Sequence, residues 1–145
     1  MRRRDRGSAS VEVAILTPAF LFLIVLAAVV GRVTIAQNAI DVAAHDAARA
    51  ASIARTAGEA EDAAAAAATD TLEQQGLSCA GLDVEVDVDD FDTAPGLPTN
   101  PGNPPIVSVR VVCQVSFVDL PMLDLDQATV AASHTSPIDF YRGRT

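Results

Sequence analysis

Two cysteines are the residues of this chain best suited to forming a covalent link. Cys79 and Cys113 are the only cysteines in the sequence, so within one chain each has only the other as a partner. In an oxidising compartment they would form a disulfide bond. Closing a loop of about 33 residues stabilises a domain by roughly 3–4 kcal/mol in the chain-entropy model. The alternative is a pair of buried free thiols, which behave as small apolar side chains.

Acidic and histidine side chains add little further chemistry. Four aspartates that could suggest a calcium site lie close together in the sequence: Asp87, Asp89, Asp90 and Asp92. The EF-hand spacing and its glycine are absent, and a solvated acidic strand edge also explains the cluster. His45 and His134 fall in different predicted elements, with no ligand set or nucleophile around them. No phosphate loop, zinc spacing or catalytic triad occurs, so we expect no enzyme activity, metal, cofactor or small-molecule substrate.

A single carboxylate, Glu12, stands at the head of a long apolar run. The next 19 residues, 13–31, carry no charge. As a helix they would reach roughly 28 Å, about the thickness of a bilayer's hydrocarbon core, so we predict a transmembrane helix over 8–31. A carboxylate just inside a bilayer costs a few kcal/mol unless it is paired. Alternatively, Glu12 lies at the level of the headgroups and needs no partner.

Charge is distributed unevenly along the chain. Residues 1–7 carry four Arg and one Asp, whereas residues 33–145 carry 17 acidic residues and five Arg. The positive-inside rule therefore predicts a cytoplasmic N-terminus and a C-terminal part outside the membrane. Nucleic acid is excluded as a partner of this outer part, because phosphate binding requires a basic surface.

The N-terminal segment admits three interpretations. A cleaved signal peptide would have a shorter apolar core that ends at a small-residue site. A plain uncleaved anchor is the second interpretation. The third is processing after Gly7, because Arg6-Gly7-Ser8, with Glu12 at the fifth position after the glycine, resembles the site that prepilin peptidases cleave.

The same segment resembles a known family. Residues 6–14, RGSASVEVA, with Pro18 six residues after Glu12, are similar to the TadE-like family, pilin-related proteins of the tight-adherence (Tad/Flp) branch of type IV pilus machines. Two further segments, 46–51 and 135–142, are also similar to that family. The sister TadG-like proteins share the N-terminal pattern and are generally longer, so they remain an alternative.

The resemblance implies a minor pilin or pseudopilin that is cleaved between Gly7 and Ser8 and takes part in Tad/Flp pilus assembly. Its implied location is the bacterial inner membrane, in a single pass. The implied partners are the membrane, a prepilin peptidase, other pilins and the pilus assembly platform. Cleavage would leave an α-amino group on Ser8, and Glu12 of one subunit could neutralise the amine of its neighbour. The alternative is an unprocessed, anchored extracytoplasmic binding or scaffold protein.

The helical pattern continues beyond the predicted membrane span. Pro18 interrupts the hydrogen-bond ladder, which predicts a kink that either serves assembly or is simply tolerated. The helix is expected to continue over 32–57, and a second alanine-rich helix is expected within 58–78, after a break at Gly58 and before a stop at Gly76. The continuation carries a narrow apolar seam at alternating spacings of four and three: Ala36, Ile40, Ala43, Ala47, Ala50 and Ala54.

From residue 79 to residue 145 the sequence predicts a small β subdomain. Apolar and acidic residues alternate over 82–89, a Pro-rich loop covers 93–105, and further strands are expected over 106–118 and 128–135. If the first hairpin brings Val88 near Val107, residues 79–82 face 113–116, which makes the disulfide plausible. The predicted fold class is α+β: a pilin-like long N-terminal helix followed by an antiparallel meander of about three strands.

Overall fold

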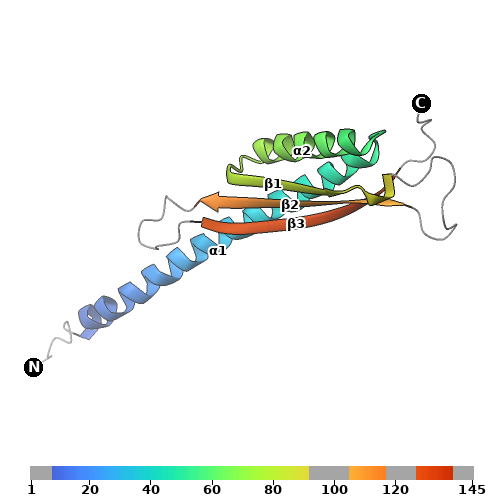
Figure 1. Cartoon of the computed structure of the whole chain (residues 1–145). Coiled ribbons are helices and arrows are strands. Elements are labelled where there is room, and N and C mark those ends of the chain that lie inside the picture. The colour runs from blue at the N-terminus through green and yellow to red at the C-terminus, as the bar shows by residue number, and fades with distance from the viewer. Residues whose placement is uncertain (1–7, 92–104, 117–126, 139–145) are drawn as a thin grey trace, which may run out of the picture. The chain divides into compact units, whose positions relative to one another are not determined.

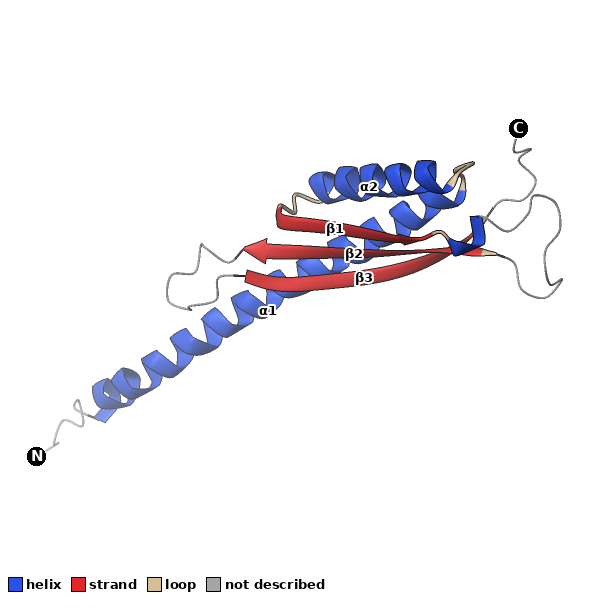
Figure 2. Cartoon of the chain, in the orientation of Figure 1, coloured by secondary structure: helices blue, strands red, loops and turns tan. Residues whose placement is uncertain are grey.

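The structure, a computed structural model, describes residues 8–91, 105–116 and 127–138. The chain divides into two compact units, Met1–Ile35 and Ala36–Thr145. A long N-terminal helix followed by a three-stranded antiparallel sheet confirms the predicted α+β class (Figures 1 and 2). In chain order the elements are α1 (Ser8–Ser52), α2 (Ala57–Gln74), β1 (Cys79–Asp87), the short 3-10 helix η1 (Asp89–Phe91), β2 (Ile106–Ser116) and β3 (Gln127–Pro137).

The sheet has the order β1-β2-β3, with every neighbouring pair antiparallel, so it is a simple meander. Leu82 lies opposite Cys113, and Asp87 lies opposite Ser108. This is the alignment predicted from Val88 opposite Val107. The predicted loop over 93–105 falls outside the described residues except for Pro105, which accepts a hydrogen bond from the backbone N–H of Ile138.

One face of the sheet is covered and the other is solvated. The middle strand, β2, supplies four fully buried side chains to the core: Val107, Val109, Val111 and Cys113. On β1 the valines are half-buried, whereas the acidic residues between them are exposed. Period-two alternation of this kind is expected for an antiparallel strand with one wet face.

The C-terminal part of α1, from Ala36 onward, contributes most of the remaining core. Gln37 Nε2 donates a hydrogen bond to the backbone oxygen of Ala131 on β3 (3.0 Å). Almost all of the buried side chains are alanines, which allow the backbones to approach closely: Ala36, Ala39, Ile40, Ala43, Ala44, Ala47, Ala48 and Ala51.

The predicted apolar seam is correct as far as Ala47 and wrong beyond it. Ala50 and Ala54 are only half-buried, and the buried stripe instead continues through Ala48 and Ala51. Alternating steps of four and three describe a narrow seam against a single partner helix. The observed stripe is two rows wide, each row advancing four residues at a time, and such rows run obliquely across a helix surface.

The turn between the helices differs from the predicted break. The first helix was expected to reach residue 57, but α1 ends at Ser52, and Gly58 lies inside the first turn of α2. Thr56 is the N-cap of α2, because its hydroxyl accepts a hydrogen bond from the backbone N–H of Glu59 (3.2 Å). The helix therefore begins where a cap is available and not at the glycine.

The C-terminal end of α2 matches the predicted stop at Gly76. Gly76 has a φ of +69°, and its N–H donates to the carbonyl of Glu73 while the N–H of Leu77 donates to that of Leu72. These two bonds define a Schellman motif, which satisfies carbonyls that the helix itself leaves unpaired. The motif turns the chain from α2 into β1.

Candidate functional site

The N-terminal unit presents an apolar surface. Between Val11 and Ile35, the large apolar side chains that are exposed range from 47% for Leu26 to 70% for Ile15. This segment belongs to the one described helix that is long and apolar enough to cross a membrane, and none of its most apolar stretch is buried inside the protein. A helix that satisfies its own backbone hydrogen bonds while exposing such side chains suits a lipid environment.

Glu12 lies in the second turn of α1, four residues after Ser8, where the helix begins. Positions i and i+4 occupy the same helix face, about 6 Å apart along the axis. The Glu12 side chain is exposed. Gly7 lies outside the described residues, so cleavage of the Gly7–Ser8 bond stays a prediction.

Pro18 lies inside α1, which continues as α-helix on both sides of it. Proline has no N–H, so the carbonyl of Ala14 lacks its usual helical donor. Next to it, the Thr17 hydroxyl donates to the carbonyl of Val13 (2.6 Å). The helix therefore accommodates the proline without ending, and the kink stays a prediction.

Cys79 and Cys113 form a disulfide bond, with their Cα atoms 5.4 Å apart. Cys79 lies opposite Val115 in the β1–β2 register, and the pairing shifts between Cys79 and Gly81. This irregularity sets Cys79 diagonally across from Cys113, whose side chain is fully buried in the covered face. The bond joins the first strand to the middle strand, so the alternative of two free thiols does not apply.

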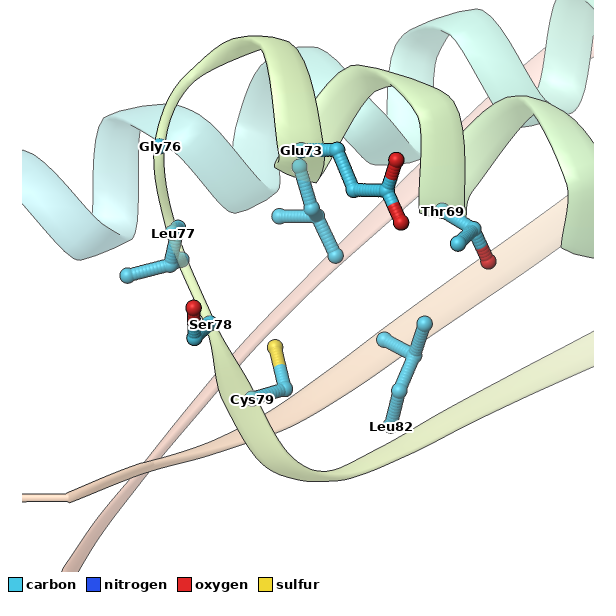
Figure 3. A pocket seen from close by; sticks show the side chains of 8 residues that line it. Thr69, Glu73, Gly76, Leu77, Ser78, Cys79 and Leu82 are labelled. Atoms are coloured by element: carbon cyan, nitrogen blue, oxygen red, sulfur yellow. The ribbon is translucent and has the colours of Figure 1, made fainter.

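An open pocket of about 400 Å³ lies beside Cys79, between the end of α2 and β1. Its aliphatic side chains are Leu72, Leu77 and Leu82, and Glu73 contributes a carboxylate (Figure 3). No residue that lines it is a histidine or a lysine, so Glu73 is the one lining side chain that could act as a base. We interpret the pocket as the loosely filled junction that follows the Schellman turn.

The two histidines, which the sequence did not bring together, are in contact. The rings of His45 on α1 and His134 on β3 have centroids 4.7 Å apart and an interplanar angle of 61°. His45 Nδ1 lies 3.2 Å from Asp46 Oδ1, and the other oxygen of Asp46 accepts a hydrogen bond from the Thr71 hydroxyl of α2 (3.2 Å). The period-two pattern of β3 places His134 on the same face as Val130, but no sequence signal identifies the helix residue that faces it.

No group of three or more His, Cys, Asp or Glu side chains among the described residues is placed to hold a metal ion. In the aspartate cluster, Asp87 has a local structural role, because its carboxylate accepts a hydrogen bond from the backbone N–H of Asp89 (3.3 Å) at the start of η1. Asp92 lies outside the described residues.

Comparison with protein families gives a match over residues 7–49 to the family described as TadE-like protein. The matched segment includes Gly7, Glu12 and Pro18, and it confirms the resemblance found in the N-terminal part of the sequence. The family is a pilus-related structural family, and the match together with the apolar helix fits a Tad-associated, membrane-anchored protein. Neither the curated proteins nor the solved structures provide a match.

Proposed function

We propose that this protein is a minor pilin or pseudopilin that takes part in assembly of a Tad/Flp type IV pilus. The observation that carries the proposal is the family match over residues 7–49. Nearly all of this segment belongs to α1, which exposes an apolar surface from Val11 to Ile35. From Ala36 onward the same helix becomes part of a folded, disulfide-bonded domain. Anchor and domain are thus parts of one secondary-structure element.

Membrane insertion is expected to follow the charge asymmetry. The four arginines among residues 1–7 would hold the N-terminus in the cytoplasm of the bacterial inner membrane, and the acidic domain would lie on the extracytoplasmic side. The disulfide supports this orientation, because such bonds persist in oxidising compartments.

Processing after Gly7 would couple insertion to assembly. Removing residues 1–7 takes away the arginines and creates an α-amino group on Ser8, one helical turn before Glu12. In the hydrocarbon region an unpaired carboxylate is costly. Pairing the Glu12 carboxylate with the Ser8 α-amine of a neighbouring subunit would remove this cost. The pairing would therefore favour associated subunits over isolated subunits in the membrane. The partners that this scheme requires are a prepilin peptidase, other pilins and the assembly platform.

The test is the N-terminus of the mature protein, isolated from membranes of cells with and without the prepilin peptidase. We expect Ser8 as the first residue when the peptidase is present and an intact leader when it is absent. Gly7→Val should block processing, whereas the control Gly31→Ala should leave it unchanged, because a Cβ at Gly31 meets no atom within 4 Å. An N-terminus at Met1 or Arg2 in peptidase-containing cells would support an unprocessed anchored scaffold protein instead.

A further inference from the structure

An open pocket of about 380 Å³ lies at the β3 edge of the sheet, between β3 and the end of α1. Two elements line it: α1 and the turn after it contribute His45, Arg49, Ser52 and Ile53, and β3 contributes His134 to Pro137. We refer to this site as the cationic pocket. Three of its side chains, one guanidinium and two imidazoles, carry or can gain a positive charge.

The cationic pocket gathers most of the basic side chains of its unit. Among the described residues of 36–138 there are three arginines and two histidines, and Arg49, His45 and His134 all line this pocket. Arg110 lies 4.0 Å from Glu85, but no such carboxylate partner is found for Arg49 within the described residues. Asp46, beside His45, is an acidic group that touches this cluster, and its second oxygen accepts a hydrogen bond from the Thr71 hydroxyl.

The opposite edge of the same sheet has the opposite charge. Residues 57–91, which form α2, β1 and η1, contain ten acidic residues and no Arg, Lys or His. The carboxylates on α2 and β1 are exposed: Glu59, Glu61, Asp62, Asp70, Glu73, Asp83, Glu85 and Asp87. We refer to this surface as the acidic edge. Because the strand order is β1-β2-β3 and α2 lies alongside β1, the acidic edge and the cationic pocket are on opposite edges of the sheet (Figure 1).

We propose that the cationic pocket of one copy binds carboxylates from the acidic edge of a second copy. The pocket offers a guanidinium, which matches a carboxylate in geometry and charge, together with imidazole donors. Because the two surfaces are different and lie on opposite edges, the contact is head-to-tail, and each copy added leaves one free pocket and one free acidic edge. Association of this type forms an open row of copies unless the rotation between neighbours closes the row into a ring.

The contact need not be strong to matter. Solvent-exposed ion pairs are individually weak. Anchoring both copies in one membrane raises their effective concentration, so several weak pairs acting together are sufficient. The inference rests on the proposed function, because that function brings copies of the protein together in one membrane. The contact itself needs neither processing at Gly7 nor pairing of Glu12.

The test is site-specific photo-crosslinking of the full-length protein in its native membrane. Ile53 lines the cationic pocket, is 52% exposed and carries no charge, so it is replaced by a photoreactive residue. Cells that express labelled and unlabelled copies together distinguish crosslinks between copies from those within a copy. We expect mass spectrometry to identify peptides from residues 57–91 of another copy. The same probe at Gln114, exposed on the middle strand, is the control and should not give these peptides.

Charge reversal identifies the cause of the crosslink. Arg49→Glu should lower the yield at Ile53 by roughly tenfold, and Arg49→Lys should retain most of it. Limited proteolysis of the same samples, with the wild-type protein as reference, shows whether the variants are folded. Crosslinks only to lipid, only to another protein, or at an unchanged yield in Arg49→Glu would overturn the proposal. The N-terminus of the same samples keeps the two proposals separate, because an intact leader with crosslinked copies contradicts only the proposed function.

Discussion

His45 on α1 and His134 on β3 place their ring centroids 4.7 Å apart, edge against face. Through Asp46, which contacts His45 and accepts a hydrogen bond from Thr71, the ring pair belongs to a series of side-chain contacts from α2 across α1 to β3. The alanine core of this unit has few large side chains with which to lock elements together, so polar and aromatic contacts at its margin gain importance.

The histidine pair should couple α1 to β3 energetically. In a double-mutant cycle with His45→Ala and His134→Ala, we expect a coupling free energy of about 0.5–1.5 kcal/mol, by analogy with pairs of aromatic rings. Urea unfolding of the full chain in detergent, followed by circular dichroism, measures it. Ser133→Ala, at an exposed position next to His134, is the control. Strictly additive effects of the two substitutions would contradict the contact.

The buried stripe of α1 predicts a contrast between two alanines. Ala47 is fully buried, and Ala47→Leu should lower the free energy of unfolding by about 1–3 kcal/mol, because the added methylenes must displace packed neighbours. Ala50 is only half-buried, so Ala50→Leu should change the free energy of unfolding by less than about 0.5 kcal/mol. Thermal or urea unfolding of the two variants side by side tests the contrast. Equal effects would favour the narrow seam expected from the sequence.

Replacing either of two glycines near the ends of α2 by alanine should change the stability of the protein, in opposite directions for the two positions. Gly76 has a φ of +69°, so Gly76→Ala should destabilise the protein by about 1–2 kcal/mol, although a Cβ there meets nothing within 4 Å. Gly58 is helical and equally open, so Gly58→Ala should stabilise by about 0.5–1 kcal/mol. Melting temperatures of both variants are sufficient to decide. A stabilised Gly76→Ala variant would show that the Schellman turn is not formed.

Loss of the disulfide should be the most damaging single change in the domain. In Cys79→Ser with Cys113→Ala, the unfolded chain regains the freedom of a loop with a sequence separation of 34, at a cost of roughly 3–4 kcal/mol. We expect rapid proteolysis of the extracytoplasmic part in cells and a matching loss of stability in urea. Reduction of the wild-type protein should reproduce the effect, and an unaffected stability on reduction would contradict it.

Glu12 provides a test of the assembly proposal alone. Glu12→Gln should insert in the membrane normally, because it removes a charge, yet it should enter filaments about tenfold less efficiently, since it cannot neutralise an amine. Glu12→Asp, which keeps the charge, should assemble better than Glu12→Gln. Membrane fractionation and immunoblotting of sheared pili give the two readouts. Normal incorporation of Glu12→Gln would place the side chain at the headgroup level without a partner.

Sequence reasoning worked best for the sheet, because its signals are local and mutually consistent. Alternation over 82–89 and 106–116 identifies the inward faces, and placing Val88 opposite Val107 brings residues 79–82 to face 113–116. That alignment is the observed one, with Asp87 opposite Ser108.

Features that depend on tertiary neighbours were predicted poorly. The alanine pattern of α1 fits more than one stripe, and only the sheet and α2 select the oblique pair of rows that includes Ala48 and Ala51. Likewise, the break was predicted at Gly58, whereas the hydrogen bond from the Glu59 N–H to the Thr56 hydroxyl places the start of α2 at the threonine. The meeting of His45 with His134 joins segments 89 residues apart, and no local period encodes it.

The covalent link between β1 and β2 also has a mechanical consequence. If the domain were pulled apart from its ends, the chain between Cys79 and Cys113 could not extend, because the disulfide closes it into a loop. At about 3.5 Å per residue, roughly 120 Å of chain is thereby withheld from elongation. Tension would instead be carried from α2 through the bond directly into the middle strand, and the unfolded domain would be shorter by the length of this loop.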